Sequence, residues 1–149
     1  MMRVMVVEDE EMIRKGIVMA VDWAALDCIV VGEAANGEQA LAVAEDCRPT
    51  LIITDLKMPK MDGLEMVRRL REAGSRAYVI ILTAYDSFAY AQTAIRLGAV
   101  DFLLKPFHDG DLENAVLALQ KRIAAQTAPQ PEPLPGVKPG PKSRYVREA

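Results

Sequence analysis

Short apolar runs alternate along the chain with stretches in which apolar residues recur every three or four positions. The apolar runs cover residues 3–7, 29–34, 51–54, 78–83 and 100–104. The periodic stretches cover residues 12–21, 38–45, 64–73 and 87–97, and the last runs from Asp109 or Asp111 to about residue 125. Short continuous apolar runs are typical of strands buried on both faces, and the 3.6-residue period is typical of amphipathic helices. The pattern therefore predicts five strands that alternate with five helices.

This alternation, with short connections, favours right-handed crossovers between parallel strands and a sheet covered by helices on both faces. Breaker residues agree with the expected helix ends, since Pro49, Gly74 and Gly98 each follow a periodic stretch. We therefore expect an α/β fold, namely a flavodoxin-like (βα)5 doubly wound sheet of five parallel strands in the order 2-1-3-4-5.

The composition changes after Ala125. Of the 9 prolines in the chain, six lie between Gln126 and Pro141, and such a segment buries too little apolar area to fold. We predict a folded domain over residues 1–125 and a proline-rich linker over residues 126–142. Residues 143–149, SRYVREA, look like the opening of another helix, so we expect them to start a truncated further domain of a longer protein.

Charge and hydropathy narrow the classes of function. The net charge of −3 offers no basic surface for nucleic acid phosphates. The chain has no apolar stretch of about 18 residues and no signal-peptide pattern, so we expect a cytoplasmic protein without a membrane partner. Cys28 and Cys47 lack metal-ligand spacing, and we expect reduced thiols.

Acidic residues follow two of the predicted strands. Asp55 ends the central apolar run, and Glu8 and Asp9 follow the first one. In the expected strand order these two strands are neighbours, and their carboxyl ends meet at one edge of the sheet. Crowded carboxylates either raise a pKa or hold a hard divalent cation such as Mg²⁺. Acid groups at strand ends are also common in solvated loops, so the cluster alone leaves both interpretations open.

The same edge is expected to carry Thr83 and Lys105, which end or follow the fourth and fifth runs. A carboxylate can accept a phosphoryl group as an acyl phosphate, a reaction that needs positioning and positive charge more than covalent help. We predict that Asp55 is the acceptor and that Thr83, Lys105 and the backbone N–H groups of Leu56 and Ala84 contact the phosphoryl oxygens. Taken singly, a strand threonine and a loop lysine have simpler structural explanations.

Four motifs occur in order along the chain: VVEDE at Val6–Glu10, TDLKMPKMDG at Thr54–Gly63, LTA at Leu82–Ala84 and DFLLKPF at Asp101–Phe107. Together they resemble the receiver domain of bacterial two-component response regulators, over roughly residues 2–125. The resemblance implies that a sensor histidine kinase phosphorylates Asp55. It also implies a signalling domain rather than an enzyme, one that only phosphorylates and dephosphorylates itself.

The resemblance implies a magnesium site as well. Asp9 and Asp55 would bind Mg²⁺ directly, together with the backbone carbonyl of Lys57. Glu8 would act largely through water, and it stands where the family more commonly has Asp.

The resemblance also assigns the parts of a conformational switch. Lys105 and Thr83 would hold the phosphoryl oxygens, and the peptide bond before Pro106 is expected to be cis. Thr83 would move toward the phosphoryl group, and Phe102 would follow into the space it leaves. Simple core packing is an alternative interpretation of Phe102. The surface around the fourth and fifth helices would then change its affinity, giving a phosphorylation-dependent homodimer.

Three further segments, IRKGI at Ile13–Ile17, VDW at Val21–Trp23 and GEAANGEQAL at Gly32–Leu41, resemble receivers that precede an AraC-type helix-turn-helix output domain. This subgroup implies a transcription regulator. It would contact DNA only through the output domain, which these residues do not include.

Three other classes of protein share part of this pattern. A phosphatase of the haloacid dehalogenase type needs a D-x-D motif with its nucleophile on the first strand, whereas this chain has E-D there. A flavin binder needs a phosphate loop after the first strand, where the acids at residues 8–10 would repel phosphate. A stand-alone receiver that acts through protein–protein contact would keep the site but lack an output domain.

Overall fold

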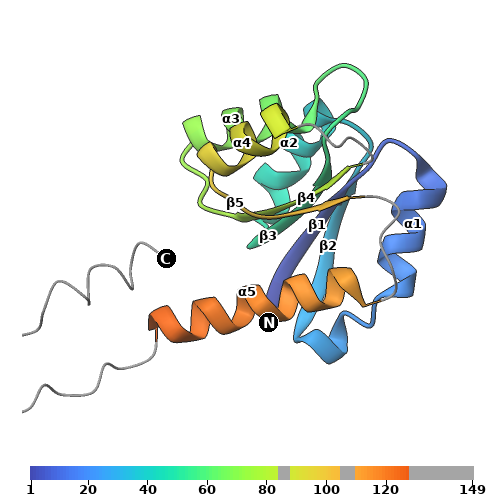
Figure 1. The fold of residues 1–149 in the computed structure, drawn as a ribbon. Coiled ribbons are helices and arrows are strands. Elements are labelled where there is room, and N and C mark those ends of the chain that lie inside the picture. The colour runs from blue at the N-terminus through green and yellow to red at the C-terminus, as the bar shows by residue number, and fades with distance from the viewer. Residues whose placement is uncertain (84–87, 105–109, 128–149) are drawn as a thin grey trace, which may run out of the picture.

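The computed structural model describes residues 1–83, 88–104 and 110–127, and within them the chain forms one parallel sheet (Figure 1). Its strands are β1 (Met2–Val7), β2 (Cys28–Ala34), β3 (Leu51–Asp55), β4 (Tyr78–Thr83) and β5 (Ala99–Leu104). Every pairing is parallel, and the strand order is β2-β1-β3-β4-β5. The predicted fold class and strand order are confirmed.

The helices are α1 (Glu11–Ala20), α2 (Gly37–Cys47), α3 (Gly63–Glu72), α4 (Phe88–Arg96) and α5 (Asp111–Thr127). Figure 1 shows α2, α3 and α4 on one face of the sheet and α1 and α5 on the other. This arrangement explains why the strands are continuous apolar runs, because helices cover both of their faces. The last helix continues to Thr127, two residues into the range predicted as linker.

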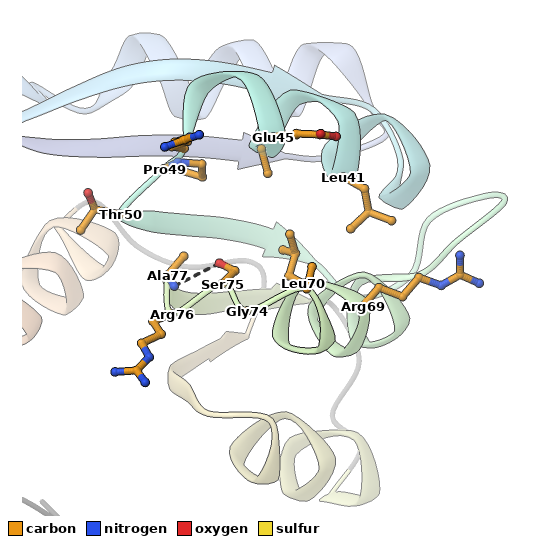
Figure 2. Close-up of a pocket in the computed structure, with 13 residues that line it drawn as sticks. Leu41, Glu45, Pro49, Thr50, Arg69, Leu70, Gly74, Ser75, Arg76 and Ala77 are labelled. Atoms are coloured by element: carbon orange, nitrogen blue, oxygen red, sulfur yellow. Dashed lines mark hydrogen bonds between the residues drawn. The ribbon is translucent and has the colours of Figure 1, made fainter.

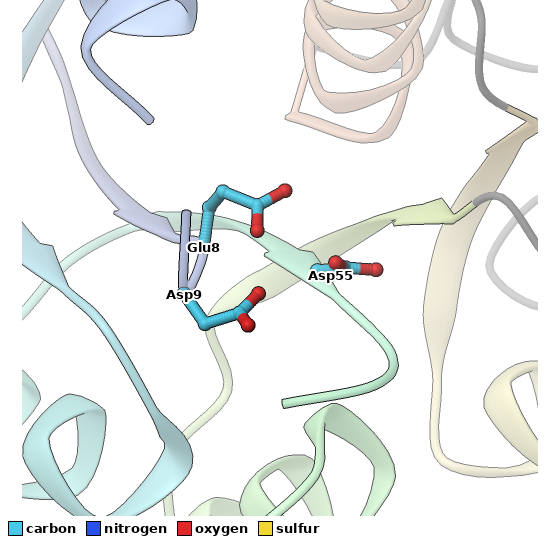
Figure 3. Close-up of side chains that lie close together, drawn as sticks. All are labelled: Glu8, Asp9 and Asp55. Carbon is cyan, nitrogen blue, oxygen red and sulfur yellow. The ribbon is translucent and has the colours of Figure 1, made fainter. Parts of the chain in front are cut away.

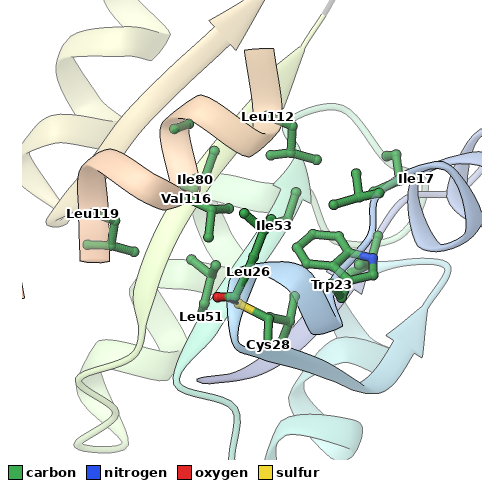
Figure 4. Close-up of a cluster of buried hydrophobic side chains, with 14 of the residues drawn as sticks. Ile17, Trp23, Leu26, Cys28, Leu51, Ile53, Ile80, Leu112, Val116 and Leu119 are labelled. Carbon is green, nitrogen blue, oxygen red and sulfur yellow. Dashed lines mark hydrogen bonds between the residues drawn. The ribbon is translucent and has the colours of Figure 1, made fainter. Parts of the chain in front are cut away.

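The core between the sheet, α1 and α5 is built around Trp23 (Figure 4). This side chain is 7% exposed, and its Nε1 donates a hydrogen bond to the carbonyl of Val18 at 3.2 Å. A short 3-10 helix, η1 (Ala24–Leu26), follows it and brings Leu26 into the same core. The loop after α1 is thereby anchored beneath the sheet.

The core on the other face packs α2, α3 and α4 against the sheet. Two of these helices have polar side-chain caps: Asn36 accepts the Gln39 N–H at 2.8 Å, and Asp62 accepts the Glu65 N–H at 2.8 Å. Such caps accept hydrogen bonds from backbone N–H groups in the first turn of a helix, which have no acceptor within the helix. They fix the entry of α2 and α3 beside the carboxyl-terminal edge of the sheet.

Both cysteines are free thiols, in agreement with the sequence-based expectation. Cys28 is buried in the core of α1 and α5, and Cys47 is partly buried at the end of α2. Burial raises the pKa of each thiol, which keeps both in the neutral form.

Strand register positions the polar residues at one edge. Val7 pairs with Thr54, so the residues that follow them, Glu8 and Asp55, lie side by side at the ends of β1 and β3. Asp55 pairs with Leu82, which places Thr83 one residue further along β4. The parallel sheet thus brings to one edge residues that are far apart in the sequence.

Candidate functional site

Three carboxylates meet at the carboxyl-terminal edge of the sheet (Figure 3). Glu8 and Asp9 follow β1, and Asp55 is the last residue of β3. One oxygen from each of the three lies within 4.8 Å of the others. The structure therefore brings together the acids that the sequence analysis placed at this edge.

Glu8 is buried, with 2% of its surface exposed. Its backbone N–H donates to the carbonyl of Ala34 at 3.0 Å, and its Oε2 accepts the N–H of Glu10 at 3.1 Å. A buried carboxylate is costly unless hydrogen bonds or a cation compensate it. The turn after β1 supplies one such hydrogen bond.

Burial and the neighbouring acids both change the pKa of Asp9. Partial burial of its carboxyl group is the main cause that raises its pKa to about 6, and the hydrogen bond to Glu8 and the charge of Glu8 add to this effect. The negative charge of Asp55 contributes less. Because like charges at short range disfavour ionisation, the cluster gains from an added cation.

The loop after β3 closes tightly around Asp55. Oδ1 of Asp55 accepts the N–H of Leu56 at 2.8 Å. This N–H group, which the sequence analysis predicted to contact the phosphoryl oxygens, is therefore directed at the carboxylate of Asp55 itself. Gly63 donates its N–H to the carbonyl of Leu56 at 2.7 Å. A Cβ at Gly63 would lie 2.2 Å from the carbonyl oxygen of Asp55. Only a residue without a side chain permits this approach.

The start of α2 supports the same loop from outside. The N–H of Gly37 donates to the carbonyl of Met61 at 3.1 Å, and Met61 is buried against the core of α2 and α3. Lys60 adopts a left-handed backbone with φ of 70° to complete the turn. This support was not predicted from the sequence, because it depends on a contact between segments that are far apart in the sequence.

The other predicted site residues divide into two groups. Thr83 ends β4 and is fully buried, Phe102 is partly buried against the core of α2 and α3, and Lys57 is exposed on the loop after β3. The contact of Phe102 with this core is the packing that the alternative interpretation expected. The remaining predicted residues, Ala84, Lys105 and Pro106, lie outside the described residues.

A hollow of about 960 Å³ lies at the opposite edge of the sheet, where β3 and β4 begin (Figure 2). Leu41 of α2 and Leu70 of α3 line it together with Pro49 and Ala77. Its lining includes none of the three clustered acids. The chemistry of the acidic site is therefore separate from this hollow.

A doubly wound parallel sheet with a carboxylate cluster at its strand ends is the architecture that the sequence analysis expected for a receiver domain. Residues 4–117 match the model of the response regulator receiver domain, and the chain belongs to this family. This confirms the family identified from the sequence motifs.

Relatives carry names that agree with the family. The chain is 31% identical over 124 residues to the uncharacterized transcriptional regulatory protein YesN of Bacillus subtilis, covering 83% of this chain and 33% of that protein. It is 36% identical over 124 residues to the uncharacterized response regulatory protein VC_A0850 of Vibrio cholerae, covering 82% and 46% respectively. The chain thus spans between a third and a half of the length of these relatives.

Solved structures agree with the fold. The receiver domain of AraT, a response regulator from Geobacillus stearothermophilus, is 39% identical, with a TM-score of 0.75, 82% of this chain covered and 95% of that one. The receiver domain of the putative response regulator NarL from Mycobacterium tuberculosis is 32% identical, with a TM-score of 0.73 and coverages of 80% and 96%. Because the relatives differ in subgroup, the AraC-type assignment stays a prediction.

The helices in the described part of the chain are all too short or too polar to cross a bilayer.

Proposed function

We propose that this chain is the phosphoacceptor domain of a response regulator that controls transcription, and that Asp55 accepts a phosphoryl group from a sensor histidine kinase. The observation that carries the proposal is the cluster of Glu8, Asp9 and Asp55 at the end of the central strands. Membership of the receiver family supports it.

In the proposed reaction a carboxylate oxygen of Asp55 attacks the phosphorus of a phosphohistidine. The new O–P bond forms as the P–N bond breaks, and the imidazole nitrogen keeps the electron pair and takes a proton. For this transfer, the protein mainly has to position the reacting groups and stabilise the negative charge on the phosphoryl oxygens. Thr83, Lys105 and the N–H groups of Leu56 and Ala84 are the proposed donors to the phosphoryl oxygens.

The donor set fits Mg²⁺. Three carboxylates with oxygens within 4.8 Å of one another provide hard oxygen ligands, and burial together with the neighbouring charge of Glu8 raises the pKa of Asp9 to about 6. We propose that Asp9, Asp55 and the carbonyl of Lys57 hold the ion directly and that Glu8 acts through water. The ion, when bound, would offset negative charge on the phosphoryl oxygens.

Signalling would follow from the added charge. Phosphorylation adds about −1.5 to −2 charges and one to three charge-assisted hydrogen bonds, each worth roughly 1.5–3 kcal/mol. Inverting a two-state population from 1:99 to 99:1 takes about 5.5 kcal/mol. Since these magnitudes are comparable, we propose that Thr83 and Phe102 convert phosphorylation into homodimerisation through α4 and α5.

The proposed target lies outside the domain. Residues 128–142 would act as a linker and residues 143–149 as the start of an output domain of AraC type, through which the protein would bind DNA. The greater length of the relatives supports a longer protein.

Intact mass spectrometry tests the acceptor. After incubation with Mg²⁺ and a small acyl phosphate, the wild type should gain one phosphoryl group and Asp55→Asn should gain none. Asp46→Asn, which changes an exposed acid on α2, is the matched control and should behave like the wild type. Repeated release of phosphate from a small phosphate ester would instead favour the phosphatase alternative.

A further inference from the structure

The guanidinium group of Arg14 on α1 contacts the turn after β1 and the neighbouring strand β2. Its Nη1 donates to the backbone carbonyl of Glu8 at 2.8 Å, and its Nε donates to Oε1 of Glu33 at 3.2 Å. The Arg14 side chain is 14% exposed and that of Glu33 is 27% exposed. This is a shielded, charge-assisted contact rather than a solvated surface ion pair.

Glu33 is a firm anchor for Arg14. It lies in β2, where it pairs with Val6 of β1, and its carboxylate also accepts Nζ of Lys15 at 3.0 and 3.1 Å. Arg14 therefore joins α1, the end of β1 and the end of β2 through one planar group. The carboxylate of Glu33 also partly neutralises the positive charge of Arg14, which reduces the repulsion between Arg14 and a nearby cation.

The carbonyl that Arg14 holds belongs to the peptide unit between Glu8 and Asp9. This peptide sets the direction from which the Asp9 side chain leaves the backbone, while Ala34 and Glu10 hold the N–H and the carboxylate of Glu8. Arg14 thus adds a third hydrogen bond that holds the turn after β1, which carries two of the three clustered acids.

Arg14 is not needed to form the turn of helix in which it lies. Its backbone N–H donates to the carbonyl of Glu10 at 2.9 Å, a bond that any side chain at position 14 would leave in place. Removing the guanidinium should therefore loosen the turn at Glu8 while α1 stays helical.

We propose that Arg14 is a positioning residue for the divalent cation, because it orients the peptide unit between Glu8 and Asp9. The inference rests on the magnesium site of the proposed function. Mutation of groups that orient metal ligands through hydrogen bonds typically lowers metal affinity by about 10- to 100-fold. Arg14→Met should weaken Mg²⁺ binding by an amount in this range.

Arg3 offers a matched control. It lies on the same strand β1 and its Nε also donates to a backbone carbonyl, that of Cys47, at 3.1 Å. This contact lies at the opposite edge of the sheet, far from the acids. Arg3→Met should therefore leave the dissociation constant of Mg²⁺ within about twofold of wild type.

The experiment measures Mg²⁺ affinity by isothermal titration calorimetry of the full chain, with urea unfolding of the metal-free proteins alongside. We expect Arg14→Met to weaken binding strongly and Arg14→Lys, which keeps the charge but not the paired contacts, to weaken it less. Glu33→Gln removes the ionic anchor and should also weaken binding, which tests the inference even where Arg14→Met folds poorly.

Equal affinity for Mg²⁺ in Arg14→Met and Arg3→Met would overturn the inference and leave Arg14 a structural residue. A wild type that binds no Mg²⁺ would overturn it as well. A wild type that binds Mg²⁺ but is not phosphorylated on Asp55 would overturn the proposed function, while a loss of affinity in Arg14→Met would still support the positioning role.

Discussion

Gly63 determines how closely the loop after β3 can approach Asp55. A methyl group there would lie 2.2 Å from the Asp55 carbonyl oxygen, and backbone must move to admit it. We predict that Gly63→Ala lowers the free energy of unfolding by roughly 1–3 kcal/mol, as overpacking does, and slows phosphorylation of Asp55. Urea unfolding and time-resolved intact mass measure the two effects.

Gly16 on α1 provides the control for this substitution. Nothing lies within 4 Å of a Cβ placed there, and alanine has a higher helix propensity than glycine by about 1 kcal/mol. Gly16→Ala should therefore stabilise the protein slightly without changing phosphorylation. Loss of stability in Gly16→Ala comparable to that in Gly63→Ala would contradict the steric explanation.

The raised pKa of Asp9 predicts a pH dependence of stability in the metal-free protein. Between the ordinary value of 3.8 and about 6, the folded state binds more protons at Asp9 than the unfolded state does. The contribution of this group is therefore fully present below pH 3.8 and is lost as the pH rises through about 6. We expect the stability difference between wild type and Asp9→Asn to fall across this window and to level off above it.

Chemical denaturation at several pH values, with Asp46→Asn as the control, measures this difference. A stability difference that does not change between pH 4 and pH 7 would show that folding does not raise the pKa of Asp9.

The same titration should govern Mg²⁺ binding. Because the ion binds the carboxylate form, affinity should drop as the pH falls below about 6, approaching tenfold per pH unit for one competing proton. Calorimetric titrations at pH 5, 6 and 7 would show this loss. Affinity that stays constant over this range would contradict a role for Asp9 as a metal ligand.

At the residue level, the sequence predicted which residues cluster when those residues lie at strand ends. The clustering of Asp55 with Glu8 and Asp9 follows from topology alone, because parallel strands end at one edge. The contact of Arg14 with Glu33 spans 19 positions and depends on side-chain geometry that no periodic pattern contains. Close approach at Gly63 was likewise hidden, since any turn would accept a glycine there.

At the level of elements, Arg71 ties α3 to its neighbours. Its Nε donates to the carbonyl of Leu97 after α4 at 3.0 Å, and its Nη1 donates to the carbonyls of Ser75 and Ala77 at 3.2 and 2.7 Å. Burial lowers the pKa of this arginine, although it remains charged. The end of α3 is thereby connected to the start of β4 and to the entrance of β5.

We predict that Arg71→Met lowers the free energy of unfolding by about 1–3 kcal/mol, because it leaves partly buried carbonyls without their donors. Arg68→Met on the exposed face of the same helix removes surface ion pairs with Glu65 and Glu72 and should lower the free energy of unfolding less than Arg71→Met does. Urea unfolding of both variants makes the comparison, and equal losses would contradict the special role of Arg71.

The five predicted helices could be recognised because each carries an apolar period, and Pro49, Gly74 and Gly98 mark the ends of three of them. The short helix Ala24–Leu26 could not, since three residues show no period. Its formation depends on the burial of Trp23 and on the left-handed backbone of Asp27, with φ of 56°.

At the scale of the whole molecule, the proposed switch connects the site to the surface of α4 and α5. Thr83 is fully buried at the end of β4, so its movement would affect the packing around it. We predict that Thr83→Ala abolishes the phosphorylation-dependent change in self-association, measured by sedimentation velocity with and without acyl phosphate. Thr83→Ser, which keeps the side-chain hydroxyl, should keep this change.

The path of α5 has a further consequence. Its 17 residues span about 25 Å, and its last turns lie beside Met2, Thr50 and Tyr78, where β1, β3 and β4 begin. The polypeptide therefore leaves the domain at the pole opposite the three acids. The electrostatic field of a phosphoryl group is screened within about 8–10 Å in physiological salt, so it would not act directly on a module attached there. Such a module would respond to a structural rearrangement that extends along the whole length of the strands.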